Sequence, residues 1–185
     1  MLSYVFWHWK QPSASPADYE DRLLAFHRAL VEFPPRGFLR SWAFQISGAP
    51  WIAEAQVYED WYLVEDFASL GELNEGAVTA ARKLPHDLAA ALAGGGTAGV
   101  YKLIAGDPAA AGFATWFSKP AGVPYGEFFD SLAGWSKASG SALWQRQMTL
   151  GPAGEFCLHS EHRAEPPVEW RPVSVSLRPL VGPLC

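Results

Sequence analysis

Apolar residues recur along the chain with periods that predict strands and helices in a repeated order. Residues 4–10 alternate and are rich in aromatic side chains, a pattern typical of a strand. The same criteria predict four strands in the first part of the chain, at 4–10, 41–47, 52–61 and 99–105. Gly48, Ala49 and Pro50 separate the second strand from the third and favour a hairpin turn.

The segment after the first strand predicts an amphipathic helix. Ser15 offers an N-cap oxygen, and Pro16 suits the first helical position. Apolar residues then recur at steps of four and three and form one stripe, which comprises Tyr19, Leu23, Phe26, Leu30 and Phe33. Two further helices are expected at 66–81 and 85–93, and the second of them would end at the glycines 94–96.

The second part of the chain repeats most of this order. Strands are expected at 112–119, 142–149, 155–163 and 173–178, and a helix at 125–139. The second helix has no counterpart, because the segment 164–167 is short and contains Pro166 and Pro167. We therefore predict an α+β protein with a ferredoxin-like split βαβ repeat at 1–106 and a second, shortened repeat at 107–185.

Internal similarity supports a duplication. A shift of 109 residues (116 − 7) aligns Trp7 with Trp116, Lys10 with Lys119, Tyr19 with Phe128, Leu23 with Leu132, Phe26 with Trp135 and Arg28 with Lys137. A shift of 102 residues (144 − 42) aligns the hairpins, with Trp42 on Trp144, Gln45 on Gln147, Pro50 on Pro152 and Glu59 on Glu161. The alternative is a chance alignment of two aromatic-rich segments. We prefer duplication, because a split βαβ sheet carries helices on one face only and a second copy could cover the other face.

With this repeated order, the chain resembles the dimeric α/β-barrel superfamily, in which two ferredoxin-like sheets close on each other. The resemblance implies a pseudo-dimeric barrel whose two antiparallel sheets come from one chain. No motif selects a subfamily. Members include cofactor-free monooxygenases of antibiotic biosynthesis, muconolactone isomerases, stress-responsive barrel proteins, NIPSNAP-like proteins and haem-binding chlorite dismutases, so the fold alone does not decide the function.

Composition and charge exclude several classes of partner. The 185 residues suffice for a hydrophobic core, and the Trp (9) and Phe (11) content adds many large rings to it. The net charge of -5 and the lack of Lys/Arg clusters argue against nucleic acid and anionic membrane surfaces as partners. No apolar run is long enough to span a membrane and the first residues lack a signal-peptide pattern, so a cytoplasmic location is expected, with Cys157 and Cys185 reduced.

Strand alternation gives a first hypothesis for a ligand site. One face is expected to pack against the helices, with Val5, Trp7, Trp9, Trp42, Phe44 and Ile46. The opposite face would then send Tyr4, Phe6, His8, Lys10, Ser41, Ala43 and Gln45 toward the barrel interior. The resemblance implies that ligands are held in this interior, between the two sheets.

His8 and Tyr58 are the candidate catalytic residues. An imidazole in a partly apolar cavity can donate or accept a proton near neutral pH, although a histidine with purely structural hydrogen bonds is the more common case. Tyr58 shares a strand face with Gln56 and could line the same cavity. The candidate ligand-binding residues are Phe6, Lys10, Gln45, Gln56, Lys119 and Gln147. In the internal alignment Gln45 matches Gln147, and Lys10 matches Lys119.

No metal and no cofactor is expected. His159 and Glu161 share a strand face, but two ligands do not make a metal site. His86 and Asp87 also suggest metal ligands, but Asp87 would lie at the start of the helix predicted at 85–93, where an acidic side chain is favourable. By resemblance, a haem-binding member would carry an imidazole on the helix at 125–139, and this segment has none.

Three functions remain open at this point. The chain could bind a small aromatic or apolar ligand, or it could be a cofactor-free monooxygenase- or isomerase-like enzyme that uses His8 or Tyr58 for proton transfer. It could also form a homodimer through exposed strands or rings. A structure without a cavity of roughly 300 Å³ or more would exclude the enzyme and favour a non-catalytic barrel, whose interior could simply be filled by aromatic side chains.

Overall fold

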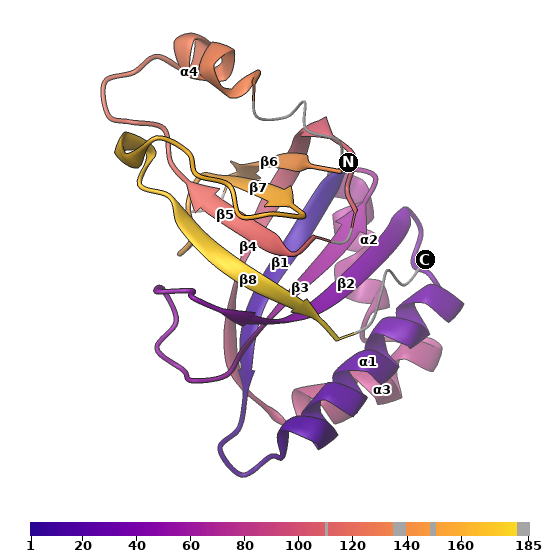
Figure 1. Cartoon of the computed structure of the whole chain (residues 1–185). Coiled ribbons are helices and arrows are strands. Elements are labelled where there is room, and N and C mark those ends of the chain that lie inside the picture. Colours follow the sequence, from indigo (N-terminus) through magenta and orange to yellow (C-terminus); the bar gives the residue numbers. More distant parts are fainter. Residues whose placement is uncertain (110, 135–139, 149–150, 181–185) are drawn as a thin grey trace.

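The chain forms a closed barrel of antiparallel strands with helices on its outside (Figure 1). The computed structural model describes residues 1–109, 111–134, 140–148 and 151–180. Within them lie eight strands: β1 (Leu2–Lys10), β2 (Phe38–Ser47), β3 (Val57–Val64), β4 (Ala93–Gly106), β5 (Phe113–Phe117), β6 (Ala142–Gln147), β7 (Phe156–Ser160) and β8 (Val173–Pro179). The helices of the described residues are α1 (Pro16–Glu32), α2 (Phe67–Gly76), α3 (Ala80–Ala90) and α4 (Tyr125–Leu132), with a short 3-10 helix, η1 (Val168–Trp170). None of these helices has the length and apolar character needed to cross a bilayer.

The two halves of the chain arrange their strands in the same order. Around the barrel the strands run β1-β3-β2-β8-β5-β7-β6-β4, and β4 pairs again with β1. The first half therefore contributes β4-β1-β3-β2, and the second half contributes β8-β5-β7-β6, in which each strand holds the equivalent position. The halves join through two ladders, β2 with β8 and β4 with β6.

Most of the predicted elements form, with shifted ends. Helix α1 starts as predicted, because Ser15 Oγ accepts a hydrogen bond of 3.0 Å from the Asp18 backbone N–H and Pro16 follows as the first helical residue. In the second half, η1 lies where the second helix is missing, between β7 and β8. The predicted helical residues 135–139 and the predicted strand residue Thr149 lie outside the described residues, as does Cys185.

The glycines 94–96 belong to a strand, so the expectation that they end a helix is wrong. Helix α3 ends before them, and Pro85 lies inside it rather than at its start. Within β4, a Cβ atom on Gly96 would lie 2.4 Å from the Phe6 ring, and one on Gly95 would lie 2.6 Å from the Trp9 ring. These glycines are needed because side chains of β1 lie across the backbone of β4.

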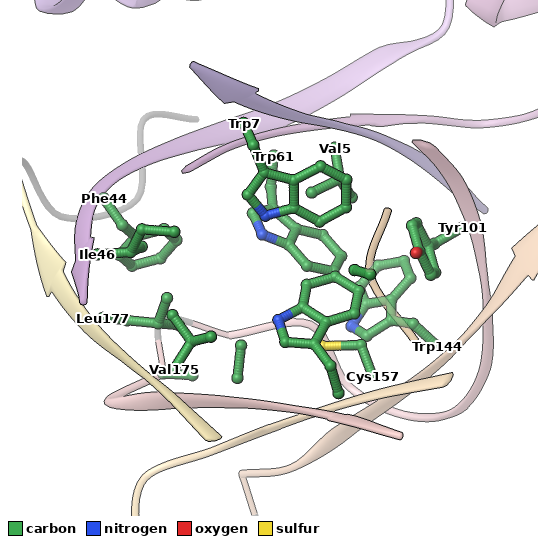
Figure 2. Close-up of a cluster of buried hydrophobic side chains, with 14 of the residues drawn as sticks. Val5, Trp7, Phe44, Ile46, Trp61, Tyr101, Trp144, Cys157, Val175 and Leu177 are labelled. Atoms are coloured by element: carbon green, nitrogen blue, oxygen red, sulfur yellow. The ribbon is translucent and has the colours of Figure 1, made fainter. Parts of the chain in front are cut away.

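The barrel interior is filled by the face that was expected to meet the helices. Trp7, Trp42, Trp61, Trp116 and Trp144 are all buried, at most 2% exposed, and most of them appear together in Figure 2 with Val5, Phe44 and Ile46. The Trp7 and Trp116 rings lie 5.2 Å apart, and the Trp61 and Trp144 rings 5.1 Å apart. The sorting of β1 and β2 residues into two faces was right, but the direction of the faces was reversed. A closed barrel of this size must fill its own interior with side chains, and the largest rings occupy it.

One carboxylate lies within this aromatic interior. Glu59 accepts a hydrogen bond of 2.6 Å from Trp7 Nε1 and one of 2.7 Å from Trp61 Nε1. His159 lies in the same interior, with its ring centroid 4.1 Å from that of Trp61. Glu59 is therefore held by two indoles, whereas His159 only packs against the Trp61 ring.

Candidate functional site

A pocket of about 740 Å³ lies between the outer face of the first-half sheet and helices α1, α2 and α3. Its sheet wall carries Tyr4, Phe6, His8, Asp60, Tyr62 and Val100. Its helix wall includes Tyr19, Leu23, Phe26, Phe67, Leu70, Leu73, Asn74 and His86, together with Gly71 and several alanines. The wall is thus largely aromatic and aliphatic, and its one acid, Asp60, lies beside His8 at the sheet.

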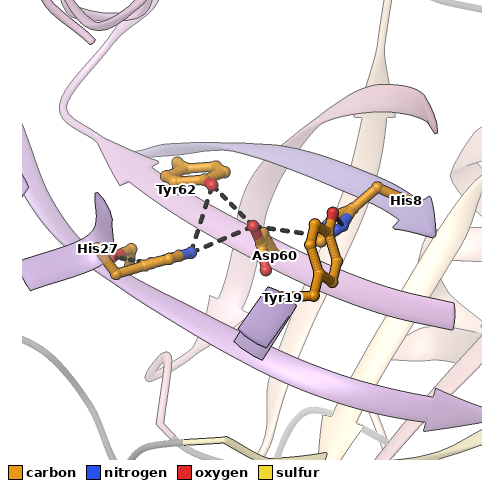
Figure 3. Close-up of polar contacts among 6 residues, drawn as sticks. His8, Tyr19, His27, Asp60 and Tyr62 are labelled. Carbon is orange, nitrogen blue, oxygen red and sulfur yellow. Dashed lines mark hydrogen bonds and ion pairs between the residues drawn. The ribbon is translucent and has the colours of Figure 1, made fainter. Parts of the chain in front are cut away.

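Asp60 lies between two imidazoles at this sheet wall (Figure 3). Its Oδ2 atom is 3.2 Å from His27 Nε2 and 3.2 Å from His8 Nε2, and the latter is an ion-pair distance without hydrogen-bond alignment. Tyr62 donates its hydroxyl to the same oxygen at 2.7 Å. All four side chains are buried, so the array is a polar cluster in a dry environment.

The second ring nitrogen of each imidazole, Nδ1, lies within hydrogen-bond distance of a hydroxyl. Tyr19 Oη lies 2.6 Å from His8 Nδ1, and Ser41 Oγ lies 2.7 Å from His27 Nδ1. Because a carboxylate can only accept hydrogen bonds, the Nε2 atoms facing Asp60 carry protons, and Nδ1 of a neutral ring accepts from the hydroxyl. Each ring is therefore held at Nδ1 by a hydroxyl and lies with Nε2 against Asp60.

Local sequence patterns bring these residues together from three elements. Alternation along β3 points Tyr58, Asp60 and Tyr62 to the helix side, and the register of β1 on β3 places His8 opposite Tyr58. Tyr19 and His27 lie on α1 at helical spacing from Leu23, on its buried face. The predicted apolar stripe of α1 is thus also the surface that delivers two polar groups to the site.

The surroundings of Asp60 favour its charged form. Burial would raise the pKa of this carboxyl, but the adjacent imidazoles of His8 and His27 together lower it below its usual range. Burial first, and then the Asp60 charge, raises the pKa of the Tyr62 hydroxyl well above its usual value. Tyr62 therefore stays protonated and donates a hydrogen bond to Asp60 at ordinary pH values.

Tyr58 touches His8 but belongs to a neighbouring network. The two rings are stacked, with centroids 5.6 Å apart and planes at 14°. The Tyr58 hydroxyl accepts a hydrogen bond of 2.8 Å from Gln56 Nε2 and donates one of 3.1 Å to Glu20 Oε1. Arg178 Nε donates to Gln45 Oε1 at 2.8 Å, and its Nη2 atom lies 3.4 Å from Glu20. The structure thus brings His8, Tyr58, Gln45 and Gln56 into one region of the outer face.

The other predicted residues divide between the pocket and more distant places. Phe6 lines the pocket beside His8, and their rings are 4.9 Å apart. Lys10 donates to the Gln11 carbonyl at 3.3 Å, and Lys119 donates to the Val123 carbonyl at 2.6 Å. Gln147 donates to the Gln145 carbonyl at 3.1 Å. The two lysines and Gln147 are not among the residues that line the pocket.

The sequence analysis missed Asp60, the centre of the cluster. The signal was present, because Glu59 and Asp60 are consecutive acids inside a predicted strand of apolar residues. Two adjacent acids in a strand must face opposite sides, and both are buried here. The sequence analysis also missed His27, which lies four residues after Leu23 on the buried face of α1. Within the described residues, no group of three or more His, Cys, Asp or Glu side chains is arranged to hold a metal ion.

This closed antiparallel barrel with outer helices agrees with the barrel fold that the resemblance led us to expect. No protein-family model matches the chain, and no curated protein matches it. Among solved structures, a protein of Fusobacterium nucleatum subsp. nucleatum named as a candidate monooxygenase is similar, with a TM-score of 0.65, 10% identity, and coverage of 97% of this chain and 92% of that one. An anthrone oxidase-like protein gives a TM-score of 0.49 at 10% identity, with coverage of 97% and 93%. At this identity the first likeness shows the fold alone.

Proposed function

We propose that the protein binds a small molecule with an aromatic or apolar body in the pocket between the first-half sheet and its helices. The observation that carries this proposal is the pocket of about 740 Å³, whose mostly apolar wall ends at a buried carboxylate held by imidazoles. Small-molecule sites have this size and this combination of apolar walls with few polar groups. We expected the ligand between the two sheets, but indoles fill that interior. The proposed ligand site therefore lies on the helix side of the first-half sheet.

A second candidate is an enzyme of the cofactor-free monooxygenase or isomerase type. The contact of His8 with the ionised Asp60 supports it, because an imidazolium formed by accepting a ligand proton would be stabilised by the carboxylate. The ligand would lose a proton from an acidic C–H or O–H group to the Tyr19 hydroxyl, whose own proton would pass to His8 Nδ1. Tyr58 would hold the His8 ring by stacking. The name of the Fusobacterium protein is compatible with this candidate.

A pocket-filling variant tests the binding proposal. Gly71 lines the pocket and lies in α2, and a Cβ atom there would meet nothing within 4 Å. Gly71→Trp should fill the pocket and abolish the thermal shift produced by aromatic fragments. Gly126→Trp is the matched control, because Gly126 lies in α4 and a Cβ atom there also meets nothing within 4 Å. Equal fragment binding by both variants would contradict the proposal.

Exchange of ligand hydrogen for deuterium tests the enzyme candidate. A bound ligand with an acidic C–H group should exchange with D2O by NMR in the wild type and lose this exchange in His8→Gln, while its affinity changes little. Tyr58→Phe keeps the stacked ring and should retain exchange. Unchanged exchange in His8→Gln would remove His8 from the proton transfer.

We infer that the chain consists of two ferredoxin-like repeats, at 1–106 and 107–185. The equivalent strand orders support this inference, as do the interior positions of Trp7 and its aligned residue Trp116. Trp42 and its aligned residue Trp144 likewise both face the interior. The aligned residues Trp135 and Lys137 lie outside the described residues.

A further inference from the structure

One oxygen of Asp60 lacks a partner. Tyr62 and the two imidazoles approach Oδ2, whereas Oδ1 is buried and has no hydrogen-bond donor among the described residues (Figure 3). A buried acceptor without a donor is costly and is rare in native proteins. Since Asp60 lines the pocket, a ligand is the natural source of the missing donor.

The charge of the pocket wall favours one kind of ligand. The described residues that line it include no Lys or Arg, and Asp60 is the one carboxylate among them. The titratable groups that face Asp60 are His8, His27, Tyr4, Tyr19 and Tyr62, and the two imidazoles meet Oδ2 rather than Oδ1. An anionic ligand would therefore approach a buried carboxylate with no fixed cation to hold it.

The aromatic wall adds a second, independent preference. Six rings of Phe or Tyr line the pocket: Tyr4, Phe6, Tyr19, Phe26, Tyr62 and Phe67. The faces of such rings attract ammonium groups, and pockets with aromatic walls are a general means of binding organic cations. The net charge of -5 also favours the approach of a cation.

We propose that the pocket takes an organic cation, an amine whose ammonium group donates to Asp60 Oδ1 while its apolar body lies against the rings. This proposal rests on the binding function above and names its ligand class. The ammonium supplies both the absent hydrogen bond and a counter-charge for the carboxylate.

Three probes with the same naphthalene ring test the proposal. Isothermal titration at neutral pH would compare 1-naphthylmethylamine, 1-naphthalenemethanol and 1-naphthoate, which carry a cation, a neutral hydroxyl and an anion. We expect the amine to bind at least tenfold more tightly than the alcohol, and the alcohol more tightly than the acid. An alcohol or acid that bound as tightly as the amine would overturn the ligand class while leaving a binding pocket in place. Absence of binding by all three would overturn this proposal and count against the pocket function itself.

A variant without the Asp60 charge tests whether this carboxylate causes the preference for the amine. Asp60→Asn should reduce the ratio of amine to alcohol affinity to near one. Asp21→Asn removes the same charge from the exposed surface of α1 and should leave the ratio unchanged. If Asp60→Asn kept the full ratio, the carboxylate would not be the ammonium partner. The wild-type ranking decides the ligand class even if Asp60→Asn fails to fold.

Discussion

Burial shifts the pKa values of two side chains in the barrel interior in opposite directions. Burial raises the pKa of Glu59 to about 7, and the hydrogen bonds from Trp61 and Trp7 only partly oppose this. Burial lowers the pKa of His159 to about 3, and neither ring nitrogen has a hydrogen-bond partner among the described residues. Both side chains therefore favour their neutral forms in the folded protein.

Their effects on stability should cancel in mildly acidic solution. The contribution of Glu59 is complete below its ordinary pKa of 4.5 and is lost as the pH rises toward 7. The contribution of His159 is complete above its ordinary pKa of 6.5 and is lost as the pH falls toward 3. Between pH 4.5 and 6.5 the two slopes oppose each other.

Single variants should reveal the two slopes. Relative to wild type, the free energy of unfolding of Glu59→Gln should rise with pH by about 1.4 kcal/mol per unit between these limits, because His159 then acts alone. That of His159→Leu should fall with pH by a similar amount. Urea denaturation at several pH values measures both. Variants whose stabilities run parallel to wild type would show that neither group titrates as the structure indicates.

At the scale of elements, the contact between β1 and β4 depends on glycine. Gly96→Ala should lower the free energy of unfolding by about 1–3 kcal/mol, because the new methyl group meets the Phe6 ring and the Trp7 carbonyl. Gly71→Ala is the matched control and should raise it by about 0.5–1 kcal/mol, since it adds a helix-favouring residue in open space. Chemical denaturation compares the two. A neutral Gly96→Ala would mean that the Phe6 ring moves away without cost.

The order of elements could be predicted because it depends on local periodicity. Alternation identifies β1 and β2, and the Ser15 cap with the apolar stripe identifies α1. The direction of the strand faces could not be predicted in this way, because it depends on closure of the barrel by strands far away in sequence. The glycines 94–96 were misassigned because their role depends on rings from β1.

The same limit applies to the candidate site. His8 and Phe6 were chosen from one strand pattern, and both line the pocket. Asp60 and His27 meet only through the packing of α1 on β3, and no short motif contains both. A cluster assembled from separate elements becomes visible only when the elements are placed in space.

At the scale of the whole molecule, two ladders among the described residues join the halves and close the barrel, β2 with β8 and β4 with β6. Fragments 1–106 and 107–185 should therefore associate when mixed, because each would otherwise expose the tryptophan-rich face of its sheet. Size-exclusion chromatography and near-UV circular dichroism would detect the complex and the Trp7–Trp116 contact. Fragment 1–92 is the control, because it lacks β4 and should not associate. Failure of 1–106 to bind 107–185 would argue against two separable repeats.

Strand β3 forms a partition with a different acid on each side, Glu59 toward the indoles and Asp60 toward the pocket. Because neighbouring side chains alternate, a one-residue slip in the register of Val57–Val64 would exchange the two carboxylates between these environments. Asp60 would then lose its imidazoles, and Glu59 its indole donors. The register of this strand is accordingly constrained by two chemistries at once, one in the barrel interior and one in the pocket.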